Sequence, residues 1–154
     1  MKQAIAALGF WFLATVAVGQ NAVDAQGRRT GPWSAKHPNG QPRYEGQFDA
    51  GVPVGRFVYY HDNGFRSAQM DYRGRSGVCA TEQYDEKGKL MARGIYNVQR
   101  QRDSLWVTYA FDGTKLEHAP YRKGALHGAY TMFYPDGKVM ERGEYVDGAK
   151  QGTW

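Results

Sequence analysis

Two histidines and one aspartate recur at equivalent positions of a repeated pattern, and they are the chain's nearest approach to a metal-binding motif. His37, His61 and Asp85 each stand three residues before a glycine that follows a turn-forming residue. Imidazole and carboxylate groups are common zinc ligands. On successive hairpins, however, these residues would lie roughly 10 Å apart, because paired strands are about 5 Å apart. One ion cannot bridge that distance, so we predict no metal and no cofactor.

The remaining reactive residues show no pattern typical of an enzyme. No serine or cysteine stands in a recognisable arrangement with a base, and the glycines lack the spacing of a phosphate-binding loop. Cys79 is the only cysteine, which excludes an intrachain disulfide and a cysteine-rich zinc site. Turn chemistry alone accounts for the residue type of Asp62, Asp85, Asp112 and Asp136. We therefore expect a non-enzymatic protein without catalytic residues.

Composition and charge narrow the class of protein further. Glycine accounts for 20 of the 154 residues and aromatic residues for 14%, which indicates many tight turns between short, half-buried strands. The formal net charge is +5, but lysine and arginine are scattered rather than gathered in a basic stripe. Nucleic acid is therefore not an expected partner.

A period of about 24 residues runs through the chain. Turn signals end at Gly40, Gly64, Gly88, Gly113 and Gly137, which are spaced 24, 24, 25 and 24 residues apart. Seven residues before these glycines stand Trp33, Phe57, Thr81, Trp106 and Tyr130. Six residues after them stand Gly46, Met70, Gly94, Ala119 and Gly143, and eight residues after them Phe48, Tyr72, Tyr96, Tyr121 and Tyr145. Such regularity predicts a repeat protein.

Each repeat is predicted to be a β-hairpin. Asn-Gly or Asp-Gly between aromatic and β-branched runs favours a two-residue type I′ turn, in which both residues have positive φ. Lys87-Gly88 is a weaker signal, so a longer or looser third turn is expected. Counting outward from Asp136-Gly137 then pairs Tyr134 with Val139, and Tyr130 with Gly143.

The same count predicts one aromatic spine along the array. It places Trp33 opposite Gly46 and Trp106 opposite Ala119. A ring opposite a residue with little or no side chain can lie across the strand and cover it. Because alternate residues of a strand share a face, the two aromatic columns gather on one side of the sheet.

The chain closes on a residue of the same column. Trp154 stands 24 residues after Tyr130, which predicts a final strand that pairs with the last hairpin and lays Trp154 over the spine. The alternative is a chain cut short of further repeats. The fold class is therefore all-β: an elongated, twisted antiparallel sheet of five hairpin repeats plus a terminal half-repeat.

The N-terminus differs from the array. Met1-Lys2 precedes an apolar run from Ala4 to Gly19, which is typical of a helical secretory signal peptide. We expect a signal peptide at 1–20 with cleavage possibly as late as 25, a linker at 21–30 and the array at 31–154. The alternative is an uncleaved membrane anchor, although the run is short for a span.

A second aromatic stripe lies on the face opposite the spine. It consists of Tyr60, Tyr84, Tyr109 and Phe133, four residues before the turn glycines. The counted strand partners of the last three are Met91, Leu116 and Met140. One interpretation is that both faces are partly packed because the sheet twists. The other is an exposed ladder that binds a partner protein, a lipid surface or a glycan.

The segments "GRFVYYHDNGFRSAQMDYRGRSG" and "GAYTMFYPDGKVMERGEYVDGAKQG" resemble copies of the MORN-repeat-variant family. The resemblance covers about Gly31 to Trp154; the third repeat departs from the pattern, and Met70 and Ala119 replace a repeat glycine. The resemblance implies an elongated hairpin sheet used as an interaction surface, without catalytic residues. Some bacterial members carry a toxin–antitoxin antitoxin label.

Together these features predict an exported bacterial repeat module. The leading expectation is protein–protein interaction or scaffolding at the cell envelope, with an unidentified protein partner in the periplasm, at the outer envelope or outside the cell. The alternative is binding of a membrane surface or a glycan through the ladder. An antitoxin-like role is the second alternative, but a signal peptide would keep the protein from a cytosolic toxin.

Overall fold

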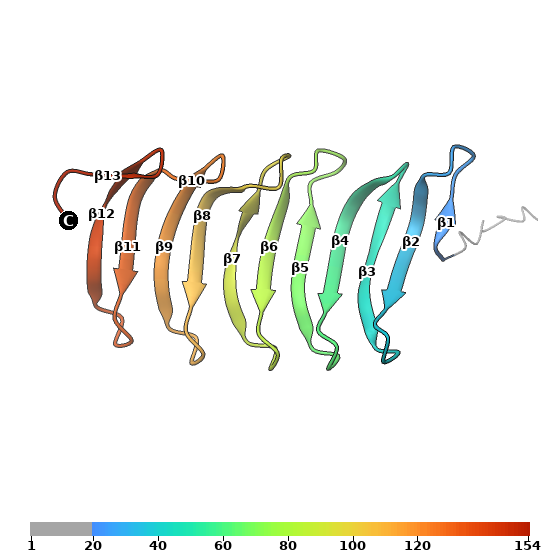
Figure 1. The fold of residues 1–154 in the computed structure, drawn as a ribbon, viewed down its shortest axis with the longest axis horizontal. Helices are drawn as coiled ribbons and strands as arrows, with labels where there is room; N and C mark the ends of the chain where they lie inside the picture. The colour runs from blue at the N-terminus through green and yellow to red at the C-terminus, as the bar shows by residue number, and fades with distance from the viewer. Residues whose placement is uncertain (1–19) are drawn as a thin grey trace, which may run out of the picture.

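The computed structural model describes residues 20–154, which form one open antiparallel sheet with no helix in that range (Figure 1). Its 13 strands are β1 (Ala22–Val23), β2 (Arg29–Lys36), β3 (Pro42–Asp49), β4 (Val52–Tyr60), β5 (Arg66–Tyr72), β6 (Cys79–Tyr84), β7 (Leu90–Tyr96), β8 (Arg102–Tyr109), β9 (Lys115–Arg122), β10 (Ala125–Leu126), β11 (Gly128–Phe133), β12 (Val139–Val146) and β13 (Ala149–Gln151). The all-β prediction is confirmed. The expected signal peptide lies, apart from its last residue, outside the described residues.

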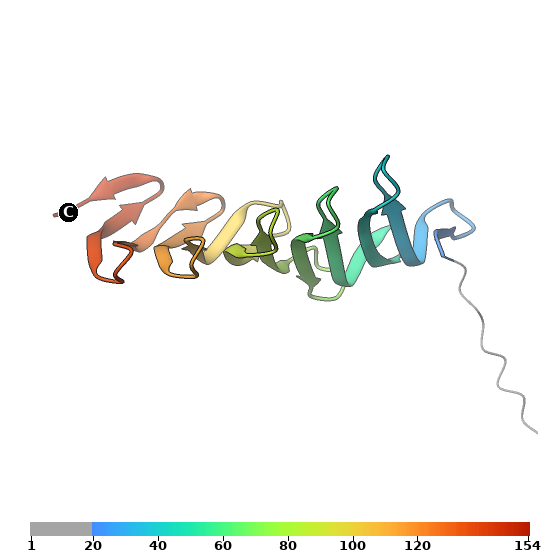
Figure 2. The same cartoon turned by 90° about the horizontal axis from the view of Figure 1, so that it is seen from below.

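The strands follow one another along the sheet in chain order, except that the short β10 pairs with β9 beside β11. Figure 1 shows them side by side along the long axis, with β1 and the C-terminus at opposite ends. Seen from below, each strand pair curls out of the mean plane of the sheet (Figure 2). Each hairpin therefore contacts only its neighbours, so stability is close to a sum over neighbouring units. Within residues 20–154 no helix offers a membrane-spanning segment.

The five hairpin tips are three-residue loops, so the predicted two-residue type I′ turn is wrong. In the last loop, the Tyr134 N–H donates to the Lys138 carbonyl at 2.8 Å, and the Gly137 N–H donates to the Tyr134 carbonyl at 2.9 Å. Gly137 has a φ of +83° and is the only residue of this loop with a positive φ. This is a type I turn followed by a left-handed glycine. The Asp136 carboxylate supports it by accepting from the Lys138 N–H at 3.0 Å.

The third tip is not looser than the others, which corrects a second expectation. The Asp85 N–H donates to the Lys89 carbonyl at 2.9 Å, and the Gly88 N–H donates to the Asp85 carbonyl at 3.0 Å. The Asp85 carboxylate also accepts from the Lys87 and Lys89 N–H groups, at 2.9 and 2.8 Å. Asp85 thus takes the part that an Asn or Asp directly before the glycine plays in the other loops, although it stands three residues before Gly88.

A β-bulge next to each tip restores the predicted register further out. Phe133 pairs with Val139 and Met132 pairs with Glu141, which leaves Met140 as the extra residue. The predicted inner pairs Tyr134–Val139, Phe133–Met140, Tyr84–Met91 and Tyr109–Leu116 are therefore wrong by one residue. The predicted outer pairs Tyr130–Gly143, Trp33–Gly46 and Trp106–Ala119 are confirmed. The bulge cancels the offset that the third loop residue introduces.

Type I′ turns do occur, but at the opposite end of the strands, where one hairpin leads to the next. Ala50 and Gly51 both have positive φ, 46° and 84°, between the paired residues Asp49 and Val52. Lys123-Gly124 and Asp147-Gly148 have the same geometry. The two ends of the sheet therefore use different turn types.

The sheet begins earlier than the expected boundary at Gly31. Ala22 pairs with Thr30 and Val23 with Arg29, so part of the expected linker 21–30 belongs to a short first hairpin. The Trp33 indole N–H donates to the Ala22 carbonyl at 3.0 Å. This bond fixes the N-terminal hairpin to the first ring of the spine.

Candidate functional site

The predicted aromatic spine is present, and most of the ring pairs along it meet edge to face. The Phe57 ring lies between Phe48 and Tyr72, with ring centroids 5.1 and 5.5 Å away. Further along, Tyr96 contacts Trp106 at 5.0 Å. Phe57 and Trp106 are the largest fully buried side chains of the described residues. The spine is thus the core of the sheet, which is a single layer within residues 20–154.

Phe57 and Trp106 each cover the glycine of the preceding hairpin, not the residue with which they pair in their own hairpin. A Cβ atom built on Gly46 would stand 2.2 Å from the Phe57 ring, and one on Gly94 would stand 2.3 Å from the Trp106 ring. The interpretation that Trp33 covers Gly46 is therefore wrong, although the two residues pair in register. The physical reason is a second irregularity in the sheet, at the junction between hairpins.

At this junction two extra residues fold a ring back over the sheet. Glu45 pairs with Val58 and Gln47 with Val54, so Gly46 faces a three-residue stretch that begins at Gly55. Gly55 has a φ of +63°. Ser104, Gly128 and Gly152 have positive φ at the equivalent position before Trp106, Tyr130 and Trp154. A residue with positive φ therefore recurs two positions before these rings of the spine.

The final ring follows this rule. Strand β13 pairs with β12, and a Cβ atom on Gly143 would stand 2.5 Å from the Trp154 ring. Trp154 lies 4.8 Å from Tyr145, and the two rings meet edge to face. The Lys150 ammonium stands 3.8 Å from the Trp154 ring centroid. The prediction of a final strand that lays Trp154 over the spine is confirmed.

The junction between the second and third repeats breaks the rule at both of its residues. Met70 stands in the small-residue column and pairs with Thr81, which stands in the ring column. Strands β5 and β6 pair without a register shift, and Thr81 is buried with its hydroxyl 3.3 Å from the Gln69 carbonyl. A side chain at position 70 leaves no room for a ring folded back from position 81. Met70 and Thr81 therefore occur together, and Met70 becomes a wall of the space that a ring would occupy.

A hollow lies where this ring is missing. It has a volume of about 380 Å³, and its walls include Tyr59, Met70, Tyr72, Cys79, Tyr96 and Arg100. A second hollow of about 490 Å³ adjoins it along the spine face, with Tyr59, Tyr72 and Arg100 as shared walls. Arg28 and Arg29 line its far part. None of the residues lining either hollow is acidic.

Burial keeps the two phenols and the thiol of the first hollow uncharged. It raises the pKa of Tyr72 to about 12 and also raises the pKa of Tyr59 and of the Cys79 thiol. The Arg100 charge acts in the opposite direction on all three pKa values. At neutral pH the phenols are hydrogen-bond donors, and Cys79 is a thiol rather than a reactive thiolate.

The predicted ladder of Tyr60, Tyr84, Tyr109 and Phe133 lies on the other face and is half-buried. Its rings meet charged or polar side chains of the preceding strand. The Arg66 guanidinium lies 4.8 Å from the Tyr84 ring centroid, the Arg93 guanidinium 5.8 Å from the Tyr109 ring centroid, and His118 5.0 Å from Phe133. These intramolecular contacts occupy much of the stripe.

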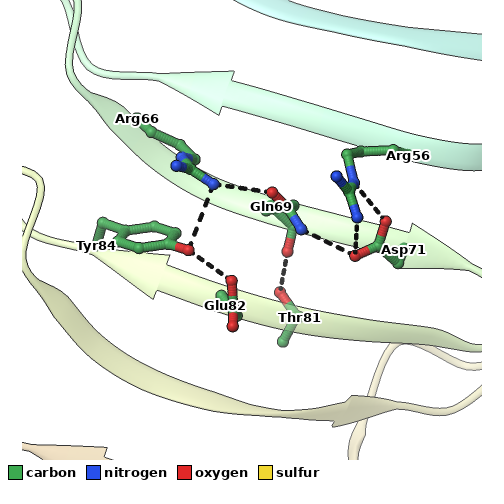
Figure 3. Close-up of polar contacts among 7 residues, drawn as sticks. All are labelled: Arg56, Arg66, Gln69, Asp71, Thr81, Glu82 and Tyr84. Carbon is green, nitrogen blue, oxygen red and sulfur yellow. Dashed lines mark hydrogen bonds and ion pairs between the residues drawn. The ribbon is translucent and has the colours of Figure 1, made fainter.

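A polar network extends the ladder face across β4, β5 and β6 (Figure 3). The Arg56 Nε donates to Asp71 Oδ1 at 2.7 Å, and this hydrogen bond lowers the pKa of the Asp71 carboxyl. Gln69 connects the two halves, because it accepts from Arg66 at 2.8 Å and donates to Asp71 at 2.9 Å. Figure 3 shows Tyr84 at the far end, between Arg66 and Glu82. The network ties neighbouring strands together.

The recurring histidines connect hairpins. His37 Nε2 lies 2.9 Å from the Tyr60 carbonyl oxygen, and His61 Nε2 lies 3.1 Å from the Tyr84 carbonyl oxygen. Each imidazole thus reaches one repeat along the sheet. No group of three potential metal ligands occurs within residues 20–154.

These features define the class: a β-hairpin repeat protein with a single-layer sheet and an interrupted aromatic spine. The family model described as MORN repeat variant matches residues 29–50 and 126–147, which contain the β2–β3 and the β11–β12 hairpins. The resemblance seen in the sequence is therefore shown at these two repeats, and the family suggests a repeat-based binding module. No curated protein matches this chain.

Proposed function

We propose that the protein is a non-enzymatic binding module that holds a partner protein on the spine face of its sheet. The observation that carries this proposal is the pair of adjoining hollows around Tyr59, Tyr72 and Arg100. They are open, aromatic and basic, and they interrupt a core that is otherwise closed by its own rings. Concave apolar sites with a few polar groups are the usual form of a binding site.

The chemistry of the hollows favours binding over catalysis. Cys79 is the one nucleophile among the named walls, and burial raises the pKa of its thiol. A protonated thiol without a neighbouring base is a poor nucleophile. The half-buried phenols and Arg100 can instead orient a ligand through hydrogen bonds and charge.

We further propose that this module works at the bacterial cell envelope. The support is the apolar run from Ala4 to Gly19 after Met1-Lys2, followed by small residues. Mass spectrometry of the chain purified from envelope and soluble fractions tests this. Export with cleavage predicts a mature protein that starts between residues 20 and 26. A full-length protein confined to the cytosol contradicts it.

Photo-crosslinking in living cells tests the binding proposal. The photoreactive p-benzoylphenylalanine replaces Val98, which lines the first hollow and is 54% exposed. The matched control replaces Val139, which lies next to a hairpin tip and is 49% exposed. A discrete protein adduct at Val98 that is absent at Val139 supports the spine face. Adducts at both positions, or at neither, contradict it.

The alternative is a membrane surface or a glycan bound through the ladder of Tyr60, Tyr84, Tyr109 and Phe133. It is favoured by the arginines that stand beside these rings. Co-sedimentation of the purified chain with anionic liposomes or with wall polysaccharide tests it. An antitoxin role requires the protein in the cytosol, so the fractionation above also tests that alternative.

A further inference from the structure

The spine lacks one ring, and the structure indicates what would replace it. In the second repeat, the Phe57 ring fills the space between Phe48 and Tyr72, at 5.1 and 5.5 Å. The equivalent space in the third repeat lies between Tyr72 and Tyr96, and it is the hollow of about 380 Å³. Its floor includes Cys79, which pairs with both tyrosines across the neighbouring strands. The space is bordered by rings and is accessible from outside.

The charge around this gap has one sign. Arg100 is exposed, sits at the tip of the turn Asn97–Gln101 with a φ of +61°, and lines both hollows. Within residues 20–154 no carboxylate lies within ion-pair distance of it. Arg29 lies beyond, over the Trp33 and Phe48 rings at 4.7 and 5.3 Å. The hollows therefore suit a ligand that carries negative charge beside an apolar group.

The extent of the site indicates a polypeptide. The second hollow continues the first along the spine face for about 490 Å³ and ends at Arg28 and Arg29. Arg28 is paired with Asp24 at 2.8 Å, so Arg29 and Arg100 supply the positive charge. Two cationic positions at different points of one groove match successive acidic side chains of a chain better than a single small anion.

We propose that the hollows bind an acidic segment of the partner protein, in which one aromatic side chain is flanked by carboxylates. The aromatic ring occupies the gap between Tyr72 and Tyr96 and completes the spine, as Phe57 does in the second repeat. A flanking carboxylate pairs with Arg100. This inference rests on the proposed function, since it names the chemistry of the partner at that site.

Synthetic peptides test the proposal on the full chain by isothermal titration calorimetry. The probe is acetyl-Glu-Glu-Trp-Glu-Glu-amide; the controls replace its tryptophan by alanine or its glutamates by lysine. We expect the probe to bind at least about tenfold more tightly than either control. Equal binding of probe and controls overturns the proposal.

Two variants locate the binding site. Arg100→Glu should weaken binding of the probe by at least about tenfold and strengthen binding of the lysine peptide. Arg142→Glu, at an exposed arginine of β12, should change the affinity for neither peptide. The double variant Met70→Gly/Thr81→Trp restores the small-residue and ring pair seen at Gly94 and Trp106, so it should fill the gap and abolish binding. Arg100→Glu lies on a surface turn, so it decides the matter even if the double variant fails to fold.

Failure here is distinguishable from failure of the proposed function. If the Val98 crosslink forms but the acidic aromatic peptide does not bind, the spine face is a binding surface and the partner chemistry is wrong. If the peptide binds and no crosslink forms in cells, the site exists and the cellular role is wrong.

Discussion

The indole of Trp106 lies directly over the backbone of Gly94, so close that a Cβ atom on the glycine would stand 2.3 Å from the ring. The glycine is therefore required because of the ring of the next hairpin, since its φ is not in the left-handed region. We expect Gly94→Ala to destabilise the fold by about 1–3 kcal/mol through overpacking. Urea unfolding followed by tryptophan fluorescence measures this.

The matched control for this prediction is Ala119, which stands in the same column one repeat further along the chain. Its Cβ atom is already accommodated, and the side chain is buried. Ala119→Gly should therefore cost only about 1 kcal/mol, mainly through backbone entropy. The double variant Gly94→Ala/Trp106→Thr should lose less than the sum of its single changes, and strict additivity would argue against direct contact.

Trp154 stabilises the C-terminal end of the sheet through its contacts with Gly143, Tyr130 and Tyr145. Because the ring is only partly buried, we expect Trp154→Ala to lower the free energy of unfolding by about 1–2 kcal/mol, less than for a fully buried tryptophan. Thermal unfolding followed by circular dichroism measures the change. Val146→Ala, at a 41% exposed side chain of β12, should have little effect. Equal effects of the two substitutions would contradict the assignment.

Ala50 occupies a left-handed conformation, with a φ of +46°, at the first position of a type I′ turn. Alanine is disfavoured there by about 1–2 kcal/mol, whereas asparagine adopts this conformation readily. Ala50→Asn should raise the free energy of unfolding by roughly 0.5–1 kcal/mol. Ala129→Asn, in strand β11, is the control and should not stabilise. A loss of stability in Ala50→Asn would show that the turn has another geometry.

The acidic loop residues make stability depend on pH. Backbone N–H donors lower the pKa of the Asp85, Asp112 and Asp136 carboxyls in the folded state. A lowered folded pKa means that the unfolded chain binds protons first, so these carboxylates contribute stability above the ordinary value of about 3.9 and lose it below. Urea midpoints should therefore fall as pH drops from about 5 to 3. Asp85→Asn, which keeps a side-chain acceptor, should flatten that slope, whereas an unchanged slope would contradict the assignment.

Local sequence patterns were sufficient for the repeat, the hairpins and the outer register. Regularly spaced glycines indicate turns, because a turn glycine acts locally through its own φ. These glycines are Gly40, Gly64, Gly88, Gly113 and Gly137. The type of turn was predicted wrongly because Asn-Gly and Asp-Gly suit both a type I′ turn and a type I turn with a left-handed glycine. The bulge next to each tip then restored the register, so the outer pairs were predicted correctly despite this error.

The coupling between repeats was less accessible from the sequence. The signal was present, because Met70 and Thr81 both depart from the residue types of their columns. Reading it required knowing that a ring covers the residue 11 or 12 positions before it, rather than its own strand partner. The hollow bounded by Tyr59, Tyr96 and Arg100 was missed for the same reason.

The sequence by itself determined that this protein is an array of hairpins whose aromatic and small residues meet on one face, since period and turn chemistry are local properties. Only the tertiary structure decided which ring lies over which glycine and where the spine is interrupted. Those contacts depend on the two-residue irregularity at junctions such as β3–β4 and β7–β8, which folds a ring back by one hairpin. The β5–β6 junction lacks this irregularity, and there the ring position is empty beside Arg100.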